Sequence, residues 1–406
     1  MTEGRTNLVK AALVLVAALA FVAPLVSRSQ GVVHSESALF RRWRPNGVSG
    51  NVRYVGADKC ISCHTNMAGA QHNAMARALE TVDQSRILKA HQQLKFQNGP
   101  YSYRITRQGD RSIYTVTDGA HTISVPIRWS FGQGRAGQTY VFEHNGSFYE
   151  SRVSFYDEIQ NLDITLGYPR TPAKSLDEAA GRALSPDESR GCIGCHSTGA
   201  VSGKQLHLDR LVPGVRCESC HGPGEKHVAA MNAGDLKEKY IFNPAKMGGD
   251  ELTQELCASC HRSAEDVMMM PDQAGINNVR FQPYRIFNSP CYSDDKRISC
   301  SACHNPHEPL RESKRDFAYY DAKCNACHLP SAKTQTSTAA KLTAINVATV
   351  GKNDHPAASA RTAPPCPTGT ENCASCHMPK IDLPGAHFKF TDHRIRVVKP
   401  GEAFPK

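Results

Sequence analysis

The stretch GVRCESCHGPGEKHV, residues 214–228, contains two cysteines separated by two residues, a histidine directly after the second cysteine, and a second histidine six residues further on. This pattern fits half of a zinc site, a thiol redox pair or a site of covalent haem attachment. The three alternatives predict different numbers of such motifs in the rest of the chain. The number of copies therefore decides between them.

The pattern C-x-x-C-H occurs seven times in the 406 residues of the chain, whereas a random arrangement of its cysteines and histidines gives roughly 0.03 copies. Motifs 2 and 3, and motifs 5 and 6, also have close to zinc-ribbon spacing. A ribbon of four cysteines, like a thiol redox pair, makes no use of the histidine that follows every cysteine pair. We number the copies motif 1 to motif 7 in chain order: Cys60–His64, Cys192–His196, Cys217–His221, Cys257–His261, Cys300–His304, Cys324–His328 and Cys373–His377.

Haem c uses both cysteines and the histidine of the pattern. The two thiols bond to the vinyl groups of the porphyrin, and the adjacent imidazole binds the iron from one side. The sequence therefore predicts seven covalently attached haem c groups. The predicted attachment residues are Cys60, Cys63, Cys192, Cys195, Cys217, Cys220, Cys257, Cys260, Cys300, Cys303, Cys324, Cys327, Cys373 and Cys376, and the predicted first iron ligands are His64, His196, His221, His261, His304, His328 and His377.

The N-terminal residues predict export from the cytoplasm. Arg5 and Lys10 precede an apolar run over residues 11–26, which is the layout of a secretory signal. We expect residues 1–30 to be either a cleaved signal peptide or an uncleaved anchor in the inner membrane, and the protein to lie in the periplasm. In an oxidising compartment the two cysteines outside the motifs, Cys291 and Cys366, are predicted to form a disulfide.

The formal net charge of the chain is +10, and its basic residues are scattered without a basic run. Scattered charge and export both argue against a nucleic-acid partner. Two propionates on every haem would further change the sign of the surface. The charge therefore identifies no partner.

The spacing of the motifs divides the chain unevenly. Six motifs lie within the 186 residues from Cys192 to His377, which is too few residues for a separate domain around each haem. The haems are expected to pack against one another and to form much of the apolar interior. Between motifs 1 and 2, alternating apolar and polar residues with QGD and HNG turns predict β-strands. We expect a haem-binding segment at 54–93, a β-rich module at 94–168 and a six-haem region at 169–397.

Helix signals accompany several motifs. Ser185, Pro186 and Glu188 form a predicted capping box before motif 2, and the residues before motifs 4 and 6 have similar character. Residues 331–372 are rich in Thr, Ala, Ser and Pro and predict a loop over the haem core. The predicted fold class is mostly α, with extensive loops around a packed multihaem core and a β-rich module inserted between motifs 1 and 2.

Eleven histidines lie outside the motifs, and a low-spin haem takes its second axial ligand from such residues. His227 and His307 follow motifs 3 and 5 closely in short polar segments, and His72 lies in a helical stretch after motif 1. His387 and His393 lie near the C-terminus. We predict these five histidines as second iron ligands.

Four stretches resemble those of bacterial multihaem cytochromes with cytochrome c-554 and c-prime domains: YVGADKCISCHTNMAGAQHNAMA, GVRCESCHGPGEKHV, RFQPYRIFNSPCYSDDKRISCSACHNPH, and CASCHMPK with HFKFTDHRI. The resemblance covers about residues 54–397. It implies a mostly helical, loop-rich fold with stacked and perpendicular haem pairs, and periplasmic electron transfer. It also implies His72, His227, His307 and His393 as second iron ligands. The number of motifs exceeds that of the smallest relatives, and the β-rich module is not part of their haem core.

Two functions are carried forward as hypotheses. The first, which we favour, is a heptahaem cytochrome that transfers electrons between membrane redox machinery and an acceptor, with redox proteins of the periplasm or inner membrane as partners. The second is a multihaem oxidoreductase that binds a small nitrogen or sulfur oxyanion at an open haem. For this second function, the open iron is expected at motif 1 or beside the β-rich module, where Arg135 and Tyr140 are candidates to line a pocket. The favoured alternative for this stretch is a β-turn with a solvated arginine and a core tyrosine.

Overall fold

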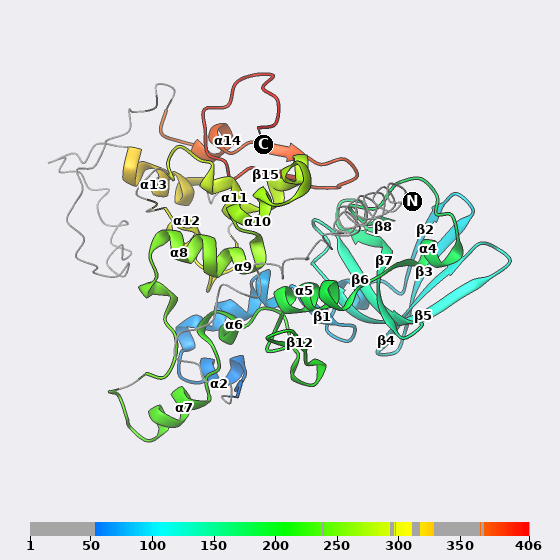
Figure 1. Ribbon diagram of the computed structural model, residues 1–406, viewed down its shortest axis with the longest axis horizontal. Helices are drawn as coiled ribbons and strands as arrows, with labels where there is room; N and C mark the ends of the chain where they lie inside the picture. The colour runs from blue at the N-terminus through cyan, green and yellow to red at the C-terminus, as the bar shows by residue number, and fades with distance from the viewer. Residues whose placement is uncertain are drawn as a thin grey trace, which may run out of the picture.

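The computed structural model describes residues 53–237, 239–292, 296, 298–310, 317–328, 366 and 369–405. The predicted export segment at 1–30 and most of the predicted loop at 331–372 lie outside these residues. The described chain forms two regions (Figure 1). We call residues 79–183 the β module, and residues 53–78 together with the described residues from 184 to 405 the motif region, because the latter contains all seven motifs.

The β module is built on one antiparallel sheet. Strands β2 to β8 pair in chain order, while β1 pairs with β5 and β9 pairs with β7. The sheet is nearly closed, because the backbone N–H of Lys95 in β2 donates to the side chain of Asn161 in β8 at 3.2 Å. Its nine strands are β1 (Leu79–Thr81), β2 (Gln93–Asn98), β3 (Tyr101–Gln108), β4 (Arg111–Thr117), β5 (Thr122–Phe131), β6 (Gln138–His144), β7 (Ser147–Tyr156), β8 (Asn161–Ile164) and β9 (Gly181–Ala183).

Local sequence explains these strands and their turns. Alternate residues of β4, among them Tyr114 and Val116, are buried, as expected for a strand with one face on a core. Asn145 and Gly146 join β6 to β7 with φ of 49° and 72°, the left-handed backbone that a two-residue hairpin turn requires. The predicted strands and the predicted HNG turn are confirmed.

The interior of the β module is filled by its own side chains. Eighteen buried apolar residues form one cluster that includes Tyr103, Tyr114, Phe142 and Phe155. Two short helices, α3 (Arg86–Ala90) and α4 (Leu176–Ala180), complete this module. A smaller cluster, which includes Trp129 of β5 and Ile193, joins the module to the helix that carries motif 2.

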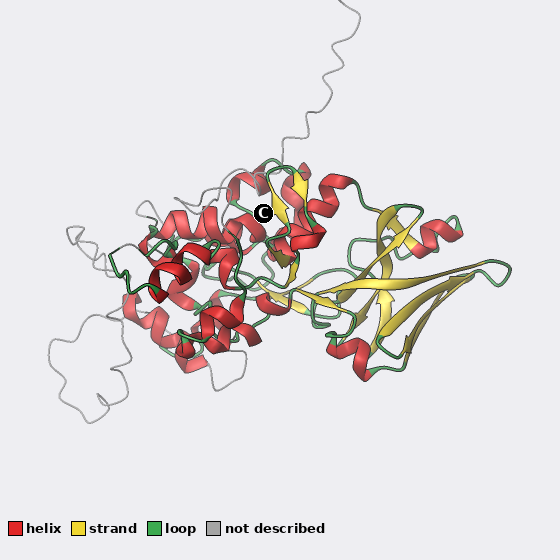
Figure 2. Ribbon diagram, turned by 90° about the horizontal axis from the view of Figure 1, so that it is seen from below, coloured by secondary structure: helices red, strands yellow, loops and turns green. Residues whose placement is uncertain are grey.

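The motif region consists of short helices, turns and three two-stranded ladders (Figure 2). Its ladders are β10 (Ser197–Thr198) with β13 (Val212–Pro213), β11 (Val201–Ser202) with β12 (Gln205–Leu206), and β14 (Lys380–Asp382) with β15 (Lys389–Thr391). Its helices and helical turns are α2 (Ala57–Ile61), η2 (Thr65–His72), η3 (Met75–Arg77), α5 (Pro186–His196), η4 (Leu208–Arg210), α6 (Cys217–His221), α7 (Glu225–Asn232), η5 (Pro244–Lys246), α8 (Gly249–Glu251), η6 (Leu252–Cys257), α9 (Ala258–His261), α10 (Ala264–Met268), η7 (Pro271–Arg280), α11 (Gln282–Phe287), α12 (Cys300–Cys303), α13 (Phe317–His328) and α14 (Cys373–His377).

The predicted capping box before motif 2 is confirmed. The Ser185 hydroxyl accepts the backbone N–H of Glu188 at 3.2 Å, and the Glu188 carboxylate accepts the backbone N–H of Ser185 at 2.9 Å. The helical character predicted before motifs 4 and 6 is also present, in α8 to α9 and in α13. None of the described helices is long and apolar enough to cross a membrane.

The prediction of a mostly α fold is wrong. Only 37% of the described residues are helical, and the largest element is the nine-stranded sheet. The motif helices are short, because a C-x-x-C-H sequence needs little more than one helical turn. The sheet also extends beyond the predicted 94–168 segment, since Leu79–Thr81 pair with β5 and Gly181–Ala183 pair with β7.

Candidate haem-attachment sites

Each motif is presented by a helical turn of the motif region. Motif 2 ends α5, motif 3 forms α6, motif 6 ends α13 and motif 7 forms α14, while motif 4 spans the junction of η6 and α9. The two cysteines of a motif are three residues apart, so a helical turn places them on one face. This arrangement suits two bonds to one flat macrocycle, with the next residue following at the end of the turn.

The cysteines of different motifs lie beside one another. The neighbouring thiols link all seven motifs into one connected series in the order 1, 3, 4, 5, 6 and 7, with motif 2 beside motif 4. In Figure 1 this series follows α2, α6, α9, α12, α13 and α14. The thiols interact directly in four pairs, Cys60 with Cys217, Cys195 with Cys260, Cys257 with Cys300 and Cys324 with Cys373. In two further pairs, Cys220 with Cys260 and Cys303 with Cys327, they interact only through their charges.

Three motif histidines each face a histidine from outside the motifs. The ring centres of His64 and His227 are 6.3 Å apart, with an angle of 22° between the ring planes. The rings of His221 and His307 are 6.1 Å apart at 20°. The third pair joins motif 5 to the C-terminal segment, because the ring centres of His304 and His393 are 6.3 Å apart, with an angle of 44° between the ring planes.

The spacing of these rings fits two imidazoles on opposite sides of one metal ion. A metal–nitrogen bond of about 2 Å, with each ring centre about 1.1 Å behind its nitrogen, places two such rings roughly 6.2 Å apart. Ordinary aromatic pairs cover the same range of distances. The ring nitrogens therefore provide the more specific evidence.

The Nδ1 atoms of several of these histidines are within hydrogen-bond distance of backbone carbonyl oxygens. The distances are 2.9 Å from His221 to Phe242, 2.6 Å from His227 to Lys239, and 3.1 Å from His393 to Thr391. A histidine that binds a metal through Nε2 commonly donates its other N–H to such an oxygen, which fixes the tautomer and the ring orientation. Two further motif histidines make the same contact. The Nδ1 atom of His196 is 3.0 Å from the carbonyl oxygen of Ala78, and that of His377 is 2.8 Å from the carbonyl oxygen of Arg396.

Burial favours the neutral form of several site histidines. It lowers the pKa of His196, His304 and His307, and it lowers the pKa of His393 to about 4. A metal ligand must be the neutral imidazole. The protein environment therefore keeps these rings in the form that binds iron.

Two buried carboxylates connect motifs that are distant in sequence. Glu218, between the cysteines of motif 3, is 3% exposed, and its carboxylate accepts the backbone N–H groups of Val55, Gly56 and Gly224 at 2.8 to 2.9 Å. These bonds hold the start of α2, which leads into motif 1. No sequence pattern predicted this role, because Glu218 occupies an unrestricted position of the motif.

The second carboxylate belongs to Asp321, one turn before motif 6. Its two oxygens accept the backbone N–H groups of Asn372 and Cys373, both at 2.8 Å. These N–H groups lie at the start of α14, where a helix has unpaired donors. Asp321 thus caps the helix of motif 7 from a neighbouring helix.

A buried ion pair holds the segment that carries His393. Arg285 of α11 and Asp392 have fully buried side chains and form two contacts of 2.8 and 2.9 Å. Arg396 adds a contact of 2.7 Å to the same carboxylate. Because Asp392 precedes His393 directly, this network fixes the backbone next to the ring that faces His304.

The other predicted ligand positions differ from these pairs. His72 is exposed at the end of η2, and His328 of motif 6 is exposed at the end of α13. The Nε2 atom of His387 lies 2.7 Å from Asp163 in the β module, so this nitrogen already has a partner. His196 of motif 2 packs against the ring of Phe131 in β5, with ring centres 5.1 Å apart. Motif 2 thus contacts the β module.

The structure does not support the pocket expected near Arg135 and Tyr140. Tyr140 is fully buried inside the β module, while the Arg135 guanidinium lies over the ring of Phe388 in the C-terminal hairpin, 4.6 Å from its centre. The two side chains therefore do not line a common pocket, and His64 of motif 1 faces His227 instead of an open position. The predicted disulfide is also wrong, because the structure does not join Cys291 to another cysteine.

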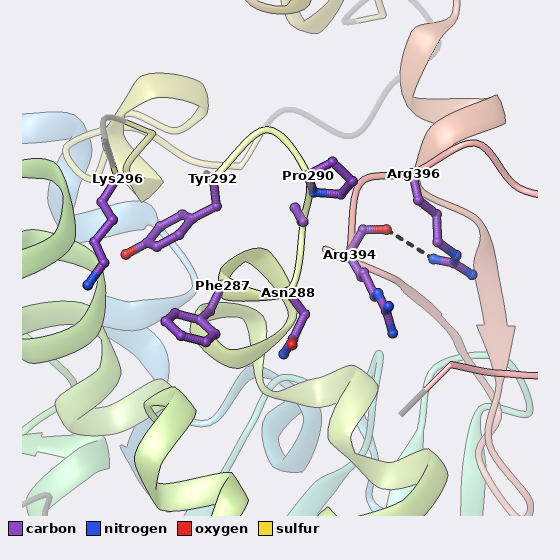
Figure 3. Close-up of a pocket in the computed structure, with 8 residues that line it drawn as sticks. Phe287, Asn288, Pro290, Tyr292, Lys296, Arg394 and Arg396 are labelled. Atoms are coloured by element: carbon purple, nitrogen blue, oxygen red, sulfur yellow. Dashed lines mark hydrogen bonds between the residues drawn. The ribbon is translucent and has the colours of Figure 1, made fainter. Parts of the chain in front are cut away.

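A cavity of about 570 Å³ lies between the segment that follows α11 and the C-terminal segment (Figure 3). Aromatic side chains (Phe287 and Tyr292) and cationic ones (Lys296, Arg394 and Arg396) line it. It adjoins motif 5, because Arg394 directly follows His393, whose ring faces His304 of that motif. Arginine pairs well with carboxylates and stacks on flat rings, so this lining suits part of a macrocycle that carries propionates. The His, Cys, Asp and Glu side chains of the described residues form no group of three or more arranged to hold a metal ion.

Comparisons with known proteins agree with this chemistry. Residues 169–222, which contain motifs 2 and 3, match the family described as cytochrome c554 and c-prime. The chain is 22% identical over 182 residues to multiheme cytochrome MtrA of Shewanella baltica, covering 36% of this chain and 54% of the relative. It is 24% identical over 210 residues to the high-molecular-weight cytochrome c of Nitratidesulfovibrio vulgaris, covering 50% of this chain and 28% of the relative.

A third relative is cytochrome c-554 of Nitrosomonas europaea, with 32% identity over 87 residues, 19% of this chain and 37% of the relative. The chain thus spans from about a quarter to about half of the length of these relatives. No solved structure matches the chain. Together, the motifs and these relatives show that the chain is a multihaem c-type cytochrome with covalently bound haem c, resembling the cytochrome c-554 and c-prime family.

Proposed function

We propose that the chain is a periplasmic heptahaem cytochrome that transfers electrons between membrane redox machinery and an acceptor protein. The observation that carries this proposal is the connected series of motif cysteines, which leaves no motif isolated. When bound, haem c supplies an iron that alternates between the ferric and ferrous states. Groups attached along one continuous series of sites suit electron transfer better than isolated sites do.

Within this proposal, the motif cysteines attach seven haems and the motif histidines are the first iron ligands. His227, His307 and His393 are the second ligands at motifs 1, 3 and 5, supported by the ring spacing and by the carbonyl contacts of Nδ1. His72 is proposed as a ligand for one of the remaining motifs. Two strong-field imidazoles on one iron favour a low-spin carrier over an open catalytic site.

Within this proposal, electrons enter and leave at the ends of the series. Motif 1 and motif 7 form the two ends of the series, and Cys63 and Cys376 at these ends are exposed, as Cys260 and Cys327 of motifs 4 and 6 are. Motif 2 is a side branch at motif 4, packed against the β module. We therefore propose that redox partners dock near motifs 1 and 7, while the β module covers the branch.

Haem number is tested by the intact mass of the protein matured with a complete haem-attachment system. Seven haems are expected on every molecule. The variant with Cys60→Ser and Cys63→Ser is the matched control and should lose one haem. A mature wild-type protein with fewer than seven haems would contradict the proposal.

The order of the series is tested by removing single attachment sites. Cys257→Ser with Cys260→Ser removes motif 4, the junction of the series, and should sharply slow electron transfer between partners at the two ends. Cys192→Ser with Cys195→Ser removes one haem from the branch and should leave this rate close to that of the wild type. Stopped-flow reduction from an immobilised donor measures both. Equal rates in the two variants would refute the order.

A further inference from the structure

The C-terminal hairpin contacts the β module through His387. This residue lies in the turn between β14 and β15, and its Nε2 atom is 2.7 Å from a carboxylate oxygen of Asp163 in β8. Asp163 is 5% exposed and also receives two bonds from Arg170, at 3.0 and 2.9 Å. The His387 ring packs against Tyr156 of β7, with ring centres 4.7 Å apart. The imidazole is therefore enclosed by β-module side chains on more than one side.

The aromatic residues of the hairpin contact both regions, Phe388 the β module and Phe390 the motif region. The Arg135 guanidinium from the β5–β6 connection lies 4.6 Å from the centre of the Phe388 ring. Arg280, at the end of η7, lies 5.9 Å from the centre of the Phe390 ring. Cation–π contacts of this kind contribute roughly 0.5–1 kcal/mol at exposed sites and more where water is excluded. Among these contacts, only the bond from His387 to Asp163 pairs the hairpin turn with a buried charge of the β module.

The hairpin leads directly to a proposed iron ligand. His393 follows β15 by two residues, and its Nδ1 atom is held by the carbonyl oxygen of Thr391, the last residue of that strand. The backbone N–H of Asp392 donates to Pro379, which precedes β14, at 2.9 Å. A displacement of the hairpin turn would therefore be transmitted along β15 to the ring that faces His304.

We propose that His387 and Asp163 form a latch through which the β module fixes His393 as the second iron ligand at motif 5. In this role His387 is a positioning residue, although its place in the sequence suggests an iron ligand. The inference rests on the proposed function, because it takes His393 as an iron ligand. It assigns the β module a part in setting the ligation of a haem that this module does not attach.

Substitutions of His387 separate the two roles. His387→Gln places an amide N–H near the position of Nε2 and can still donate to Asp163, but an amide is a poor iron ligand. His387→Phe keeps the ring packing on Tyr156 and removes the donor. Asp382→Asn is the matched control, because its exposed ion pair with Lys389 lies on the same hairpin. His393→Ala provides the reference spectrum for an open motif 5 site.

The measurement is carbon monoxide binding to the reduced protein, combined with a redox titration and the haem number from intact mass. If His387 and Asp163 form a latch, His387→Phe should gain up to one carbon monoxide-binding haem per molecule, with the spectrum of His393→Ala. One reduction potential should also shift in this variant. His387→Gln and Asp382→Asn should stay close to the wild type in both measurements. Equal gains in His387→Phe and His387→Gln would show that His387 is itself a ligand and would overturn the proposal. No change in His387→Phe would overturn it as well. Failure of the proposed function would appear separately, as a low haem number in the wild type or as a His393→Ala variant without an open site.

Discussion

The β module and the motif region hold their folds together in different ways. Eighteen buried apolar side chains form one cluster in the β module, whereas the largest separate cluster among the described residues of the motif region has three, Ala264, Val267 and Tyr284. The motif region instead relies on buried polar groups such as Glu218, Asp321 and Arg285 to join its short helices. A region of this length with so few apolar contacts needs another apolar component. Covalently attached haems supply one.

This difference predicts that haem attachment decides the folding of one region only. When the full chain is produced without haem attachment, the motif region should fail to fold, while the β module keeps its structure because its core contains only side chains. Limited proteolysis with mass spectrometry measures this and should leave a protected fragment around residues 79–183. Uniform cleavage of both regions, or protection of both, would show that the two regions depend on haem equally.

The local features of both regions are those that the sequence predicted well. The Asn145–Gly146 turn and the Ser185 capping box each depend on residues that are close neighbours in the chain, and both are present. The seven motifs are likewise local patterns. The mostly α prediction failed because helix signals next to the motifs are conspicuous, whereas β1 and β9 are three-residue strands, too short to show alternation.

The contacts between residues that are far apart in the chain could not be predicted from the sequence. The pairing of His304 with His393 joins residues that are far apart in the chain, and no local pattern specifies which motif a given histidine faces. Val55, which donates to Glu218, lies 163 residues away from it. His387 shows the same problem, since its neighbours in sequence suggest a ligand and its contact with Asp163 becomes visible only in the fold.

The side-chain core of the β module is tested by Phe142→Ala. Phe142 is fully buried, so the truncation should lower the free energy of unfolding of the β module by about 3–5 kcal/mol. The haem absorption spectrum should stay close to that of the wild type at temperatures where the β module is folded, because the haems are attached in the motif region. Thermal melting followed by circular dichroism measures the loss, and Ile159→Ala, at a site that is 40% exposed, is the control. A large loss of haem absorbance in folded Phe142→Ala would contradict a side-chain core that is separate from the haem core.

The polar network of the motif region is tested by Arg285→Met. Arg285→Met removes two charged hydrogen bonds from the buried Asp392 carboxylate and leaves Arg396 as its cationic partner, which should cost about 1.5–3 kcal/mol. The effect should appear in the motif region, as easier chemical unfolding monitored by haem absorbance. Lys389→Met, which breaks an exposed ion pair, should change the stability by less than about 1 kcal/mol. Similar behaviour of the two variants would mean that the buried network does not stabilise this region.

The smallest expected effect is that of Glu218→Gln. The amide keeps the size of the side chain but has only one acceptor oxygen for three backbone N–H groups, so we expect a loss of about 1–3 kcal/mol. Hydrogen exchange should increase at Val55 and Gly56, beside motif 1, and not in the β module. Unchanged exchange at these two residues would show that the carboxylate does not hold motif 1 against motif 3.

The central claim is that seven attachment sites form one connected series whose order differs from their order in the sequence. Anomalous scattering at the iron edge from crystals of the mature protein tests it most directly, because it locates every iron without assumptions about the chain. We predict seven iron positions, with the motif 1 iron nearest to that of motif 3 and the motif 2 iron nearest to that of motif 4. Fewer than seven positions, or a motif 1 iron nearest to that of motif 2, would contradict the account.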